Sequence, residues 1–328
     1  MKRFKNILFI SGPEEEKGKS FQRAVELAEH NGAELMVIEV IEGVPNRKIN
    51  SDRYVLAGKL LEIMIRERLT RLERMIEPII KNEKIQVSAK VVTGRLFLEV
   101  IKEVLRGKHD LVIKSTADQK GLTSALFGSS DMHLLRKCPC PVWIIKHGEK
   151  LRCSKVMAAL DVHTLDGDLE TGELNLQILE MASFLAVIEK SELHIAHAWY
   201  FFGADYLWGE PSLFTELEAK QWQEEEGEVC RLKLEELASN IKEVVETLSA
   251  EPNRLHIHLK EGDPKEIIPQ LVREQNIDLV VMGTVSRSGI SGFFIGNTAE
   301  SILHDINCSV LAVKPPGFVS PVRLEEQF

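Results

Sequence analysis

The feature that most constrains the fold is an internal repeat. The segment HDLVIKST, which begins at position 109, returns as IDLVVMGT at position 277. Asp110 aligns with Asp278, and further along the repeat Cys140 aligns with Cys308; each pair lies 168 positions apart. Because the repeated unit should fold in the same way twice, the chain of 328 residues is predicted to hold two similar domains.

Earlier parts of the two copies align at smaller offsets. Glu34 aligns with Glu192, and the strand near Lys5 aligns with the one near Lys155, 150 positions on. The second copy is therefore longer, and its extra residues lie in VHTLDGDLETGEL and AWYFFGADYLWGEPSLF. The charged stretch KHGEKLR separates the copies. We expect a first domain at 1–150, a second at 151–316 and a proline-containing tail at 317–328.

Each copy reads as alternating strands and helices. Strands alternating with helices predict βαβ units and a parallel sheet, and apolar runs such as DLVV fit strands buried on both faces. The predicted fold class is α/β, with two tandem, doubly wound, five-stranded parallel-sheet domains of the Rossmann-like kind. In the first copy we expect strands at 6–11, 35–41, 85–92, 110–115 and 141–146, and helices at 18–31, 51–81, 96–106 and 129–137.

Composition excludes several classes of protein. The net charge of −9 argues against a broad nucleic-acid surface. No run of eighteen apolar residues is present, so no membrane span is expected. The first apolar run is too short for a signal peptide, and five cysteines are scattered along the chain. These features predict a cytoplasmic protein with reduced thiols.

Ligands of such sheets bind at the carboxyl ends of the strands, where the strand order reverses. The loop after the first strand, SGPEEEKGKS, is similar to a phosphate-binding P-loop. Its count fails, because five residues instead of four separate Gly12 from Gly18, and three of them are glutamates that would repel phosphate. We therefore interpret it as an ordinary loop with acids near a helix start.

The loop after the fourth strand of the second copy, VMGTVSRSGISGFFIGNTAE, is more favourable. Glycines let backbone N–H groups turn toward an anion, and a helix N-terminus adds partial positive charge. A structural turn from strand to helix fits the same residues, with Asn297 or Thr298 as the helix cap. The candidate anion-binding residues are Gly283, Ser286, Arg287, Gly289, Gly296, Asn297 and Thr298.

This loop resembles the nucleotide-binding loop of the universal stress protein family, whose ATP-binding members carry G-x2-G-x9-G-[ST]. Here Ser286 stands where the second glycine belongs, and Asn297 stands in place of Ser or Thr. The phrases GNTAE, HLLRKCP and PVW resemble the tandem E-type members, and the resemblance covers nearly the whole chain. It implies adenine nucleotide alpha hydrolase-like domains and a regulatory or protective role in stress, with little or no catalysis.

The resemblance also implies an acidic contact to adenine at the end of the first strand. Asp161 matches that position in the second copy, although an ordinary polar residue at a strand end is the alternative. ATP with Mg²⁺ is the implied ligand. In the first copy Ser11, Ser115 and Asp118 stand where the family's nucleotide contacts belong, and the Asp118 carboxylate opposes anion binding. We predict that the first copy does not bind ATP.

A second class of function stays open. The insertion Trp199–Phe214 is dense in aromatic residues within a chain that is only 6% aromatic. It would pack over a pocket or a domain, or line a site for an apolar ligand. The alternative function is therefore a carrier of a small apolar ligand, or a partner-binding scaffold with both nucleotide sites lost. By the family resemblance, the two copies would pair as a pseudo-dimer within the chain, and a homodimer of such chains is also compatible.

Histidines gather on two predicted strands of the second copy. His256 and His258 alternate along the third strand, and His194 and His197 lie on the second, with opposite parity. The aligned first-copy residues of the third strand are Ser88 and Lys90, which suggests the polar face of an edge strand. We expect no metal site. Cys138 and Cys140 form C-x-C, which is not the spacing of redox or zinc motifs.

Overall fold

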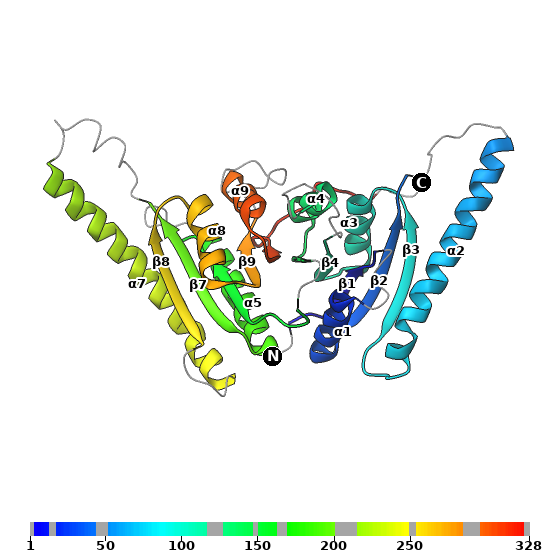
Figure 1. Cartoon of the computed structure of the whole chain (residues 1–328), viewed down its shortest axis with the longest axis horizontal. Coiled ribbons are helices and arrows are strands. Elements are labelled where there is room, and N and C mark those ends of the chain that lie inside the picture. Colours follow the sequence, from blue (N-terminus) through cyan, green and yellow to red (C-terminus); the bar gives the residue numbers. More distant parts are fainter. Residues whose placement is uncertain are drawn as a thin grey trace. The chain divides into compact units, whose positions relative to one another are not determined.

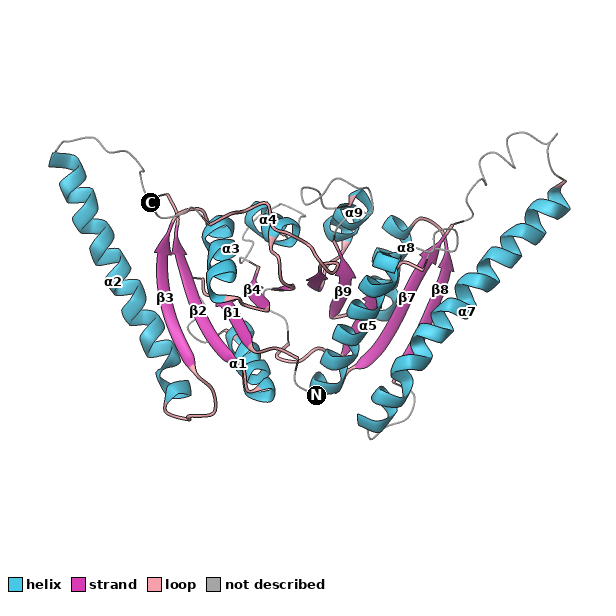
Figure 2. Cartoon of the chain, turned by 180° about the vertical axis from the view of Figure 1, so that it is seen from behind, coloured by secondary structure: helices cyan, strands magenta, loops and turns pink. Residues whose placement is uncertain are grey.

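The structure, a computed structural model, contains two compact units. Unit 1 is built mainly from Met1–Arg152, and unit 2 mainly from Cys153–Gly289 and Phe294–Gly317. Figures 1 and 2 show strands flanked by helices in both units. The structure describes residues 3–12, 18–43, 52–116, 127–146, 150–162, 169–200, 215–248, 254–284 and 296–324.

Unit 1 is a five-stranded parallel sheet in the order β3-β2-β1-β4-β5, with helices between successive strands. The predicted elements are all present, with ends that differ by at most two residues. The elements are β1 (Asn6–Ile10), α1 (Lys19–Asn31), β2 (Glu34–Ile41), α2 (Asp52–Ile80), β3 (Val87–Thr93), α3 (Leu96–Gly107), β4 (Leu111–Ser115), α4 (Ser129–Lys137) and β5 (Val142–Ile145).

Unit 2 repeats this topology in the order β8-β7-β6-β9-β10, again all parallel. Two doubly wound five-stranded sheets are therefore confirmed. The elements are β6 (Lys155–Ala159), α5 (Leu169–Glu189), β7 (Glu192–Trp199), α7 (Glu216–Leu248), β8 (Leu255–Glu261), α8 (Pro264–Gln275), β9 (Leu279–Gly283), α9 (Asn297–Asp305) and β10 (Ser309–Val313).

Consecutive residues of the central strands are buried, as parallel sheets covered on both faces require. Ile7, Leu8 and Phe9 of β1 are fully buried, and so are Val280 and Val281 of β9. Several helices end at a residue in the left-handed conformation, as helix C-termini commonly do. Helix α1, for example, ends before Gly32, which adopts a left-handed conformation with φ 62° and donates to carbonyls of the last turn.

The repeated aspartate has a structural reason. In unit 1 the Asp110 carboxylate accepts backbone N–H bonds from Lys5 (2.7 Å) and Asn6 (3.1 Å). In unit 2 Asp278 accepts the equivalent bonds from Ser154 (2.6 Å) and Lys155 (3.0 Å). Both copies thus fix the start of the first strand through the loop before the fourth, and the aspartate serves folding in each.

These pairs also correct the alignment of the first strands. Ile7 pairs with Leu111 in β4, and Val156 pairs with Leu279 in β9, so the first strands are offset by 149 positions and not 150. The unit 1 residue equivalent to Asp161 is therefore Gly12, one position after Ser11. The sequence could not settle this because apolar residues fill both strands.

The five cysteines are free and buried, consistent with reduced thiols. Cys308, aligned with Cys140, occupies the small buried position expected for it. The C-terminal segment Phe318–Phe328 groups with unit 1, where the Ser320 hydroxyl donates to the Lys137 carbonyl at 2.7 Å. Within the described ranges, none of the helices combines the length and apolar character that crossing a membrane requires.

Candidate nucleotide site in unit 2

The switch point of unit 2 lies between β6 and β9. From β6 the chain winds outward through β7 to β8, and the return strands β9 and β10 lie on its other side. Ala159 pairs with Met282, so Asp161 and Thr284 follow adjacent strands at the carboxyl edge of the sheet. This is the place where open α/β sheets bind ligands.

The backbone of Asp161 is held by a buried asparagine. The Asn175 side chain, on α5, accepts from the Asp161 N–H at 3.0 Å and donates to its carbonyl at 2.8 Å. The next strand adds His197, whose Nδ1 lies 3.1 Å from the Leu160 carbonyl. These bonds fix the backbone of Leu160 and Asp161, and the Asp161 residue is exposed. Exposure and a fixed backbone suit a carboxylate that meets a ligand.

The start of α9 adjoins the end of β9. The Gly296 N–H donates to the Thr284 carbonyl at 3.1 Å, and Gly296 is the N-cap, with φ −63° and ψ 140°. The prediction of Asn297 or Thr298 as the cap is therefore wrong. Both lie in the first turn with exposed side chains. A glycine cap has no side chain to bond the first amides of the helix, so these amides are candidate donors to an anion.

Gly283 has a packing role that the sequence did not reveal. A Cβ built on it would lie 2.9 Å from Cδ2 of Leu174, on α5. The glycine therefore lets α5 approach the end of β9. This supports the structural interpretation of one motif glycine, and it leaves the anion-binding interpretation of the helix start intact.

Lys314 is a site residue that sequence reasoning missed. It follows β10, it is 5% exposed, and its ammonium donates to the Thr284 hydroxyl at 2.6 Å. A buried cation beside the loop after β9 adds positive potential where phosphates would lie. The repeat could have pointed to this residue, since Lys314 aligns with Lys146 at the offset of 168 and both copies therefore carry a lysine after the last strand.

In unit 1 a carboxylate of α4 itself occupies the corresponding helix start. Asp131, in the first turn of α4, accepts from the Gly128 N–H at 3.0 Å and pairs with the Lys114 ammonium at 2.9 Å. Its side chain is 5% exposed. In unit 2 the equivalent positions hold Ala299 and Met282, so α9 has no such acid in that place.

Other sequence-predicted residues lie outside the described part of the chain. These are Ser286, Arg287 and Gly289 of the unit 2 loop, Asp118 of unit 1, and the residues 201–214 of the aromatic insertion. The structure therefore brings together five of the eight candidates, namely Asp161, Gly283, Gly296, Asn297 and Thr298.

The fold defines a tandem, doubly wound α/β protein. Residues 3–146 and 170–314 both match the universal stress protein family. The chain therefore belongs to that family, which has a stress-response role, and carries two family domains in tandem.

Relatives of the same layout match it along its length. Universal stress protein E of Photorhabdus laumondii is 26% identical over 338 residues, which cover 100% of both chains. The universal stress protein E homolog of Haemophilus influenzae is 28% identical over 95% of this chain and 98% of its own. A solved protein of unknown function from Pseudomonas aeruginosa is 26% identical, with a TM-score of 0.64 over 95% of this chain and 93% of its own.

Proposed function

We propose that the chain is a cytoplasmic stress-response protein that binds ATP with Mg²⁺ at the carboxyl edge of unit 2. The observation that carries this proposal is the contrast between two helix starts. Asp131 occupies the start of α4, whereas the equivalent residue on α9 is Ala299, behind a glycine cap. Backbone amides at a helix start bind phosphate, and a carboxylate already in place competes with it.

Different residues would contact the adenine and the phosphates of the nucleotide. Asp161 would accept a hydrogen bond from the adenine amino group, as the family resemblance implies. The buried Lys314 ammonium would add a positive charge near the phosphates. Glycines and amides bind phosphate without activating water, so hydrolysis is expected to be slow or absent. The phosphate side would comprise Gly283, Ser286, Arg287, Gly289, Gly296, Asn297 and Thr298.

The test installs the unit 1 acid in unit 2. Mg-ATP should raise the melting temperature of the full chain, because a ligand specific to the folded state stabilises it. Ala299→Asp should remove that rise, since the new carboxylate would occupy the α9 amides. Arg273→Gln, a change of the same sign of charge at an exposed position at the end of α8, is the control and should keep the rise.

The same measurements distinguish ATP binding by unit 2 from ATP binding by unit 1. Loss of all binding in Ala299→Asp would mean that unit 1 contributes none. Saturable binding that survives Ala299→Asp would place the site elsewhere and overturn the proposal. Absence of any shift at millimolar Mg-ATP in the unchanged protein would overturn it too.

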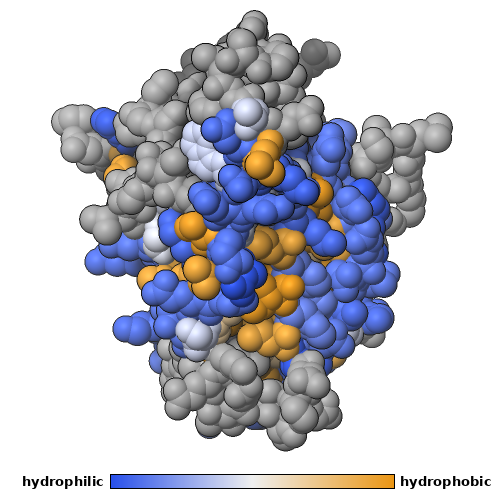
Figure 3. Space-filling model, turned by 90° about the vertical axis from the view of Figure 1, so that its left-hand side faces the viewer, coloured by the Kyte–Doolittle hydropathy of each residue, from blue (hydrophilic) through white to orange (hydrophobic). Residues whose placement is uncertain are grey.

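One observation favours the alternative function of apolar carrier or partner scaffold. Helix α7 exposes large apolar side chains, on the side of the molecule shown in Figure 3, where orange apolar atoms lie among blue polar ones. Several large apolar side chains exposed along one helix are candidates for an interaction surface. Native mass spectrometry of gently purified protein would detect a retained fatty acid under this alternative and a nucleotide under the first. The exposed residues are Leu217 (67%), Trp222 (50%), Val229 (42%) and Leu232 (54%).

A further inference from the structure

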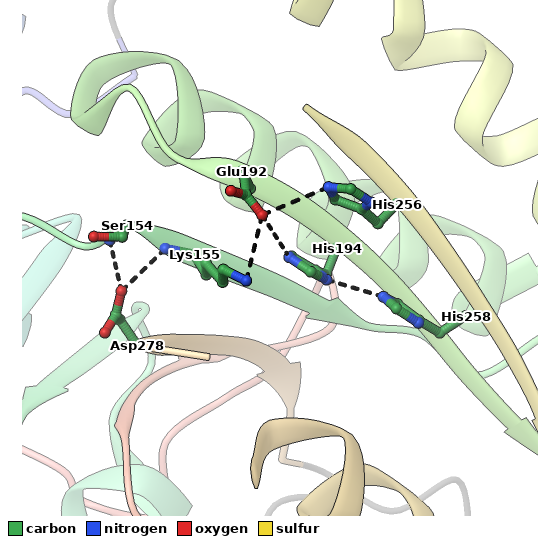
Figure 4. A network of polar contacts seen from close by, with 7 residues as sticks. All are labelled: Ser154, Lys155, Glu192, His194, His256, His258 and Asp278. Carbon is green, nitrogen blue, oxygen red and sulfur yellow. Dashed lines mark hydrogen bonds and ion pairs between the residues drawn. The ribbon is translucent and has the colours of Figure 1, made fainter. Parts of the chain in front are cut away.

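A second cluster of polar side chains lies at the opposite edge of the unit 2 sheet. Glu192 and His194 stand at the start of β7, and His256 stands at the start of β8. His194 and His256 are direct partners in the parallel register, and Glu192 precedes His194 by two positions on the same face. One ligand atom of each of the three lies within 4.8 Å of the others (Figure 4).

The distances suit one small cation. Glu192 Oε2 lies 3.6 Å from His194 Nε2 and 3.6 Å from His256 Nε2. Nitrogen and oxygen ligands of a tetrahedral zinc ion at their usual bond lengths are separated by about 3.4 Å. Glu192 and His256 are 42% and 41% exposed, so small rotations of their side chains would complete the geometry.

His194 is oriented as a metal ligand would be. Its side chain is 2% exposed, and its Nδ1 lies 2.9 Å from Nε2 of His258. In the tautomer that donates from Nδ1 to His258, the Nε2 lone pair points at the Glu192 carboxylate oxygen. Within the part of the chain that the structure describes, that buried Nε2 has no hydrogen-bond partner. Ligating histidines commonly use their second nitrogen in such a supporting hydrogen bond.

The charge balance around the cluster permits a cation. Glu192 brings the one carboxylate among the three side chains, and that carboxylate would offset part of the charge of a divalent ion. The Lys155 ammonium lies 3.5 Å from Glu192 Oε2 and is 29% exposed. It is a competitor for the carboxylate, and it would have to turn outward when a metal ion binds.

The fold does not require this cluster, because unit 1 lacks it. At the equivalent positions the first copy keeps the acid, Glu34, but carries Met36 and Ser88 in place of the two histidines. Lys155 is replaced by Asn6. The same sheet therefore forms with and without the two imidazoles, and the histidines are a property of unit 2 alone.

We propose that Glu192, His194 and His256 form an exchangeable binding site for a divalent transition-metal ion, with Zn²⁺ as the best fit. Two imidazoles and one carboxylate are zinc ligands, and a water would take the fourth position. Mg²⁺ and Ca²⁺ prefer oxygen ligands and are disfavoured here. The site lies at the amino edge of the sheet, across from the candidate nucleotide edge, so it is independent of the proposed function.

The experiment uses the untagged full chain after removal of metal by a chelator. Zn²⁺ titrated against it by calorimetry should bind in a ratio of one per chain, and bound Co²⁺ should give the visible absorption of a tetrahedral site. His256→Ser, the unit 1 residue at an exposed position, should weaken Zn²⁺ binding at least about tenfold. The double change His194→Met and His256→Ser should abolish it and the Co²⁺ spectrum.

Two further variants sharpen the assignment. Lys155→Asn, again the unit 1 residue, should tighten Zn²⁺ binding several-fold because it removes the competing charge. A merely structural role for these histidines predicts no such gain. His304→Gln is the matched control, since His304 is an exposed histidine with a carboxylate, Asp305, 3.0 Å away. It should leave binding unchanged.

The proposal is overturned if the unchanged chain binds neither Zn²⁺ nor Co²⁺ at submillimolar concentration. It is also overturned if His256→Ser binds Zn²⁺ as the unchanged chain does, or if His304→Gln causes an equal loss. Circular dichroism of each variant checks that it is folded. His256→Ser keeps the test decisive even if the change at the buried His194 prevents folding.

Discussion

Helices α4 and α9 occupy equivalent positions in two copies of one fold, but different side chains stand at their N-termini. Helix α4 satisfies its cap with Asp131, which is itself paired with Lys114. In α9, Ala299 and Met282 replace that pair. Both helices begin directly after a glycine N-cap in the extended conformation. The helix start is thus a requirement of the fold, whereas the carboxylate that accepts from the cap N–H in α4 is absent from that position in α9, whose first-turn acid is the exposed Glu300.

The difference suggests how a repeated domain loses or keeps a ligand. A buried ion pair gives its own carboxylate to the amides that would otherwise bind phosphate. Such a pair contributes little net stability compared with apolar residues of similar size, but it is costly to break. In unit 1 the start of α4 would therefore stay occupied by Asp131. Three of the changes below give one unit the residue of the other, and Asn175→Ala instead removes a support of the unit 2 site.

The largest effect is expected from Asp131→Ala, which gives unit 1 the residue of unit 2. Lys114 is 14% exposed and would be left without its carboxylate, and the Gly128 N–H would lose its acceptor. We expect a loss of about 2 to 3 kcal/mol in the free energy of unfolding, measured in urea. The double change Lys114→Met and Asp131→Ala should recover most of it, because no buried charge remains. A cost below about 1 kcal/mol for the single change would contradict this account.

Asn175→Ala should weaken the unit 2 site by releasing Asp161. Two hydrogen bonds to the Asp161 backbone disappear, so stability should fall by about 1 to 2 kcal/mol and the affinity for Mg-ATP should fall several-fold. Ser183→Ala is the control, since Ser183 lies on the same helix and its buried hydroxyl donates to the Leu179 carbonyl at 2.6 Å. It should lower stability without affecting ATP. Equal ATP binding in both variants would exclude a role for Asp161 placement.

Periodicity predicted nearly every element of both copies, because strand and helix patterns are local and occur twice. The N-cap of α9 was less predictable, since Gly296, Asn297 and Thr298 are all acceptable caps, and the hydrogen bond from the Gly296 N–H to the Thr284 carbonyl joins elements that sequence cannot place. The roles of Asn175 and Lys314 could not be predicted, because they depend on contacts between different elements of the fold. The sequence also predicted no metal site at the histidines, because Ser88 and Lys90 of the first copy indicated the polar face of an edge strand. The parity of His194 and His256 was available from the sequence, but their register was not.

Gly283→Ser would place the unit 1 residue, Ser115, in unit 2. The new Cβ would meet Leu174 Cδ2 at 2.9 Å, the far end of a flexible side chain, so we expect a modest loss of about 1 kcal/mol. Adding Leu174→Val should relieve part of the clash. If Gly283 serves packing only, Mg-ATP should still stabilise the Gly283→Ser variant. Complete loss of ATP binding with stability retained would show that the glycine contacts the ligand itself.

The smallest effect concerns His109, whose counterpart in unit 2 is Ile277; both are buried. Burial lowers the pKa of His109 below the ordinary 6.5, although Glu103 and Asp110 act in the opposite direction. At neutral pH the ring is uncharged in both states and has no pH-dependent effect. As the pH falls through about 6.5 the unfolded chain takes up a proton that the folded chain resists, so stability is lost down to the folded pKa.

His109→Ile should remove that loss. Urea unfolding at about pH 7.5 and 5.5 should show a smaller fall in stability for His109→Ile than for the unchanged chain, by less than about 1 kcal/mol. His30→Gln, at an exposed position, should leave the difference between the two pH values unchanged. An equal fall in His109→Ile would mean that other groups account for the pH dependence of unit 1. A smaller fall would show that the isoleucine of unit 2 protects that copy from acid at a site where unit 1 buries a titratable ring.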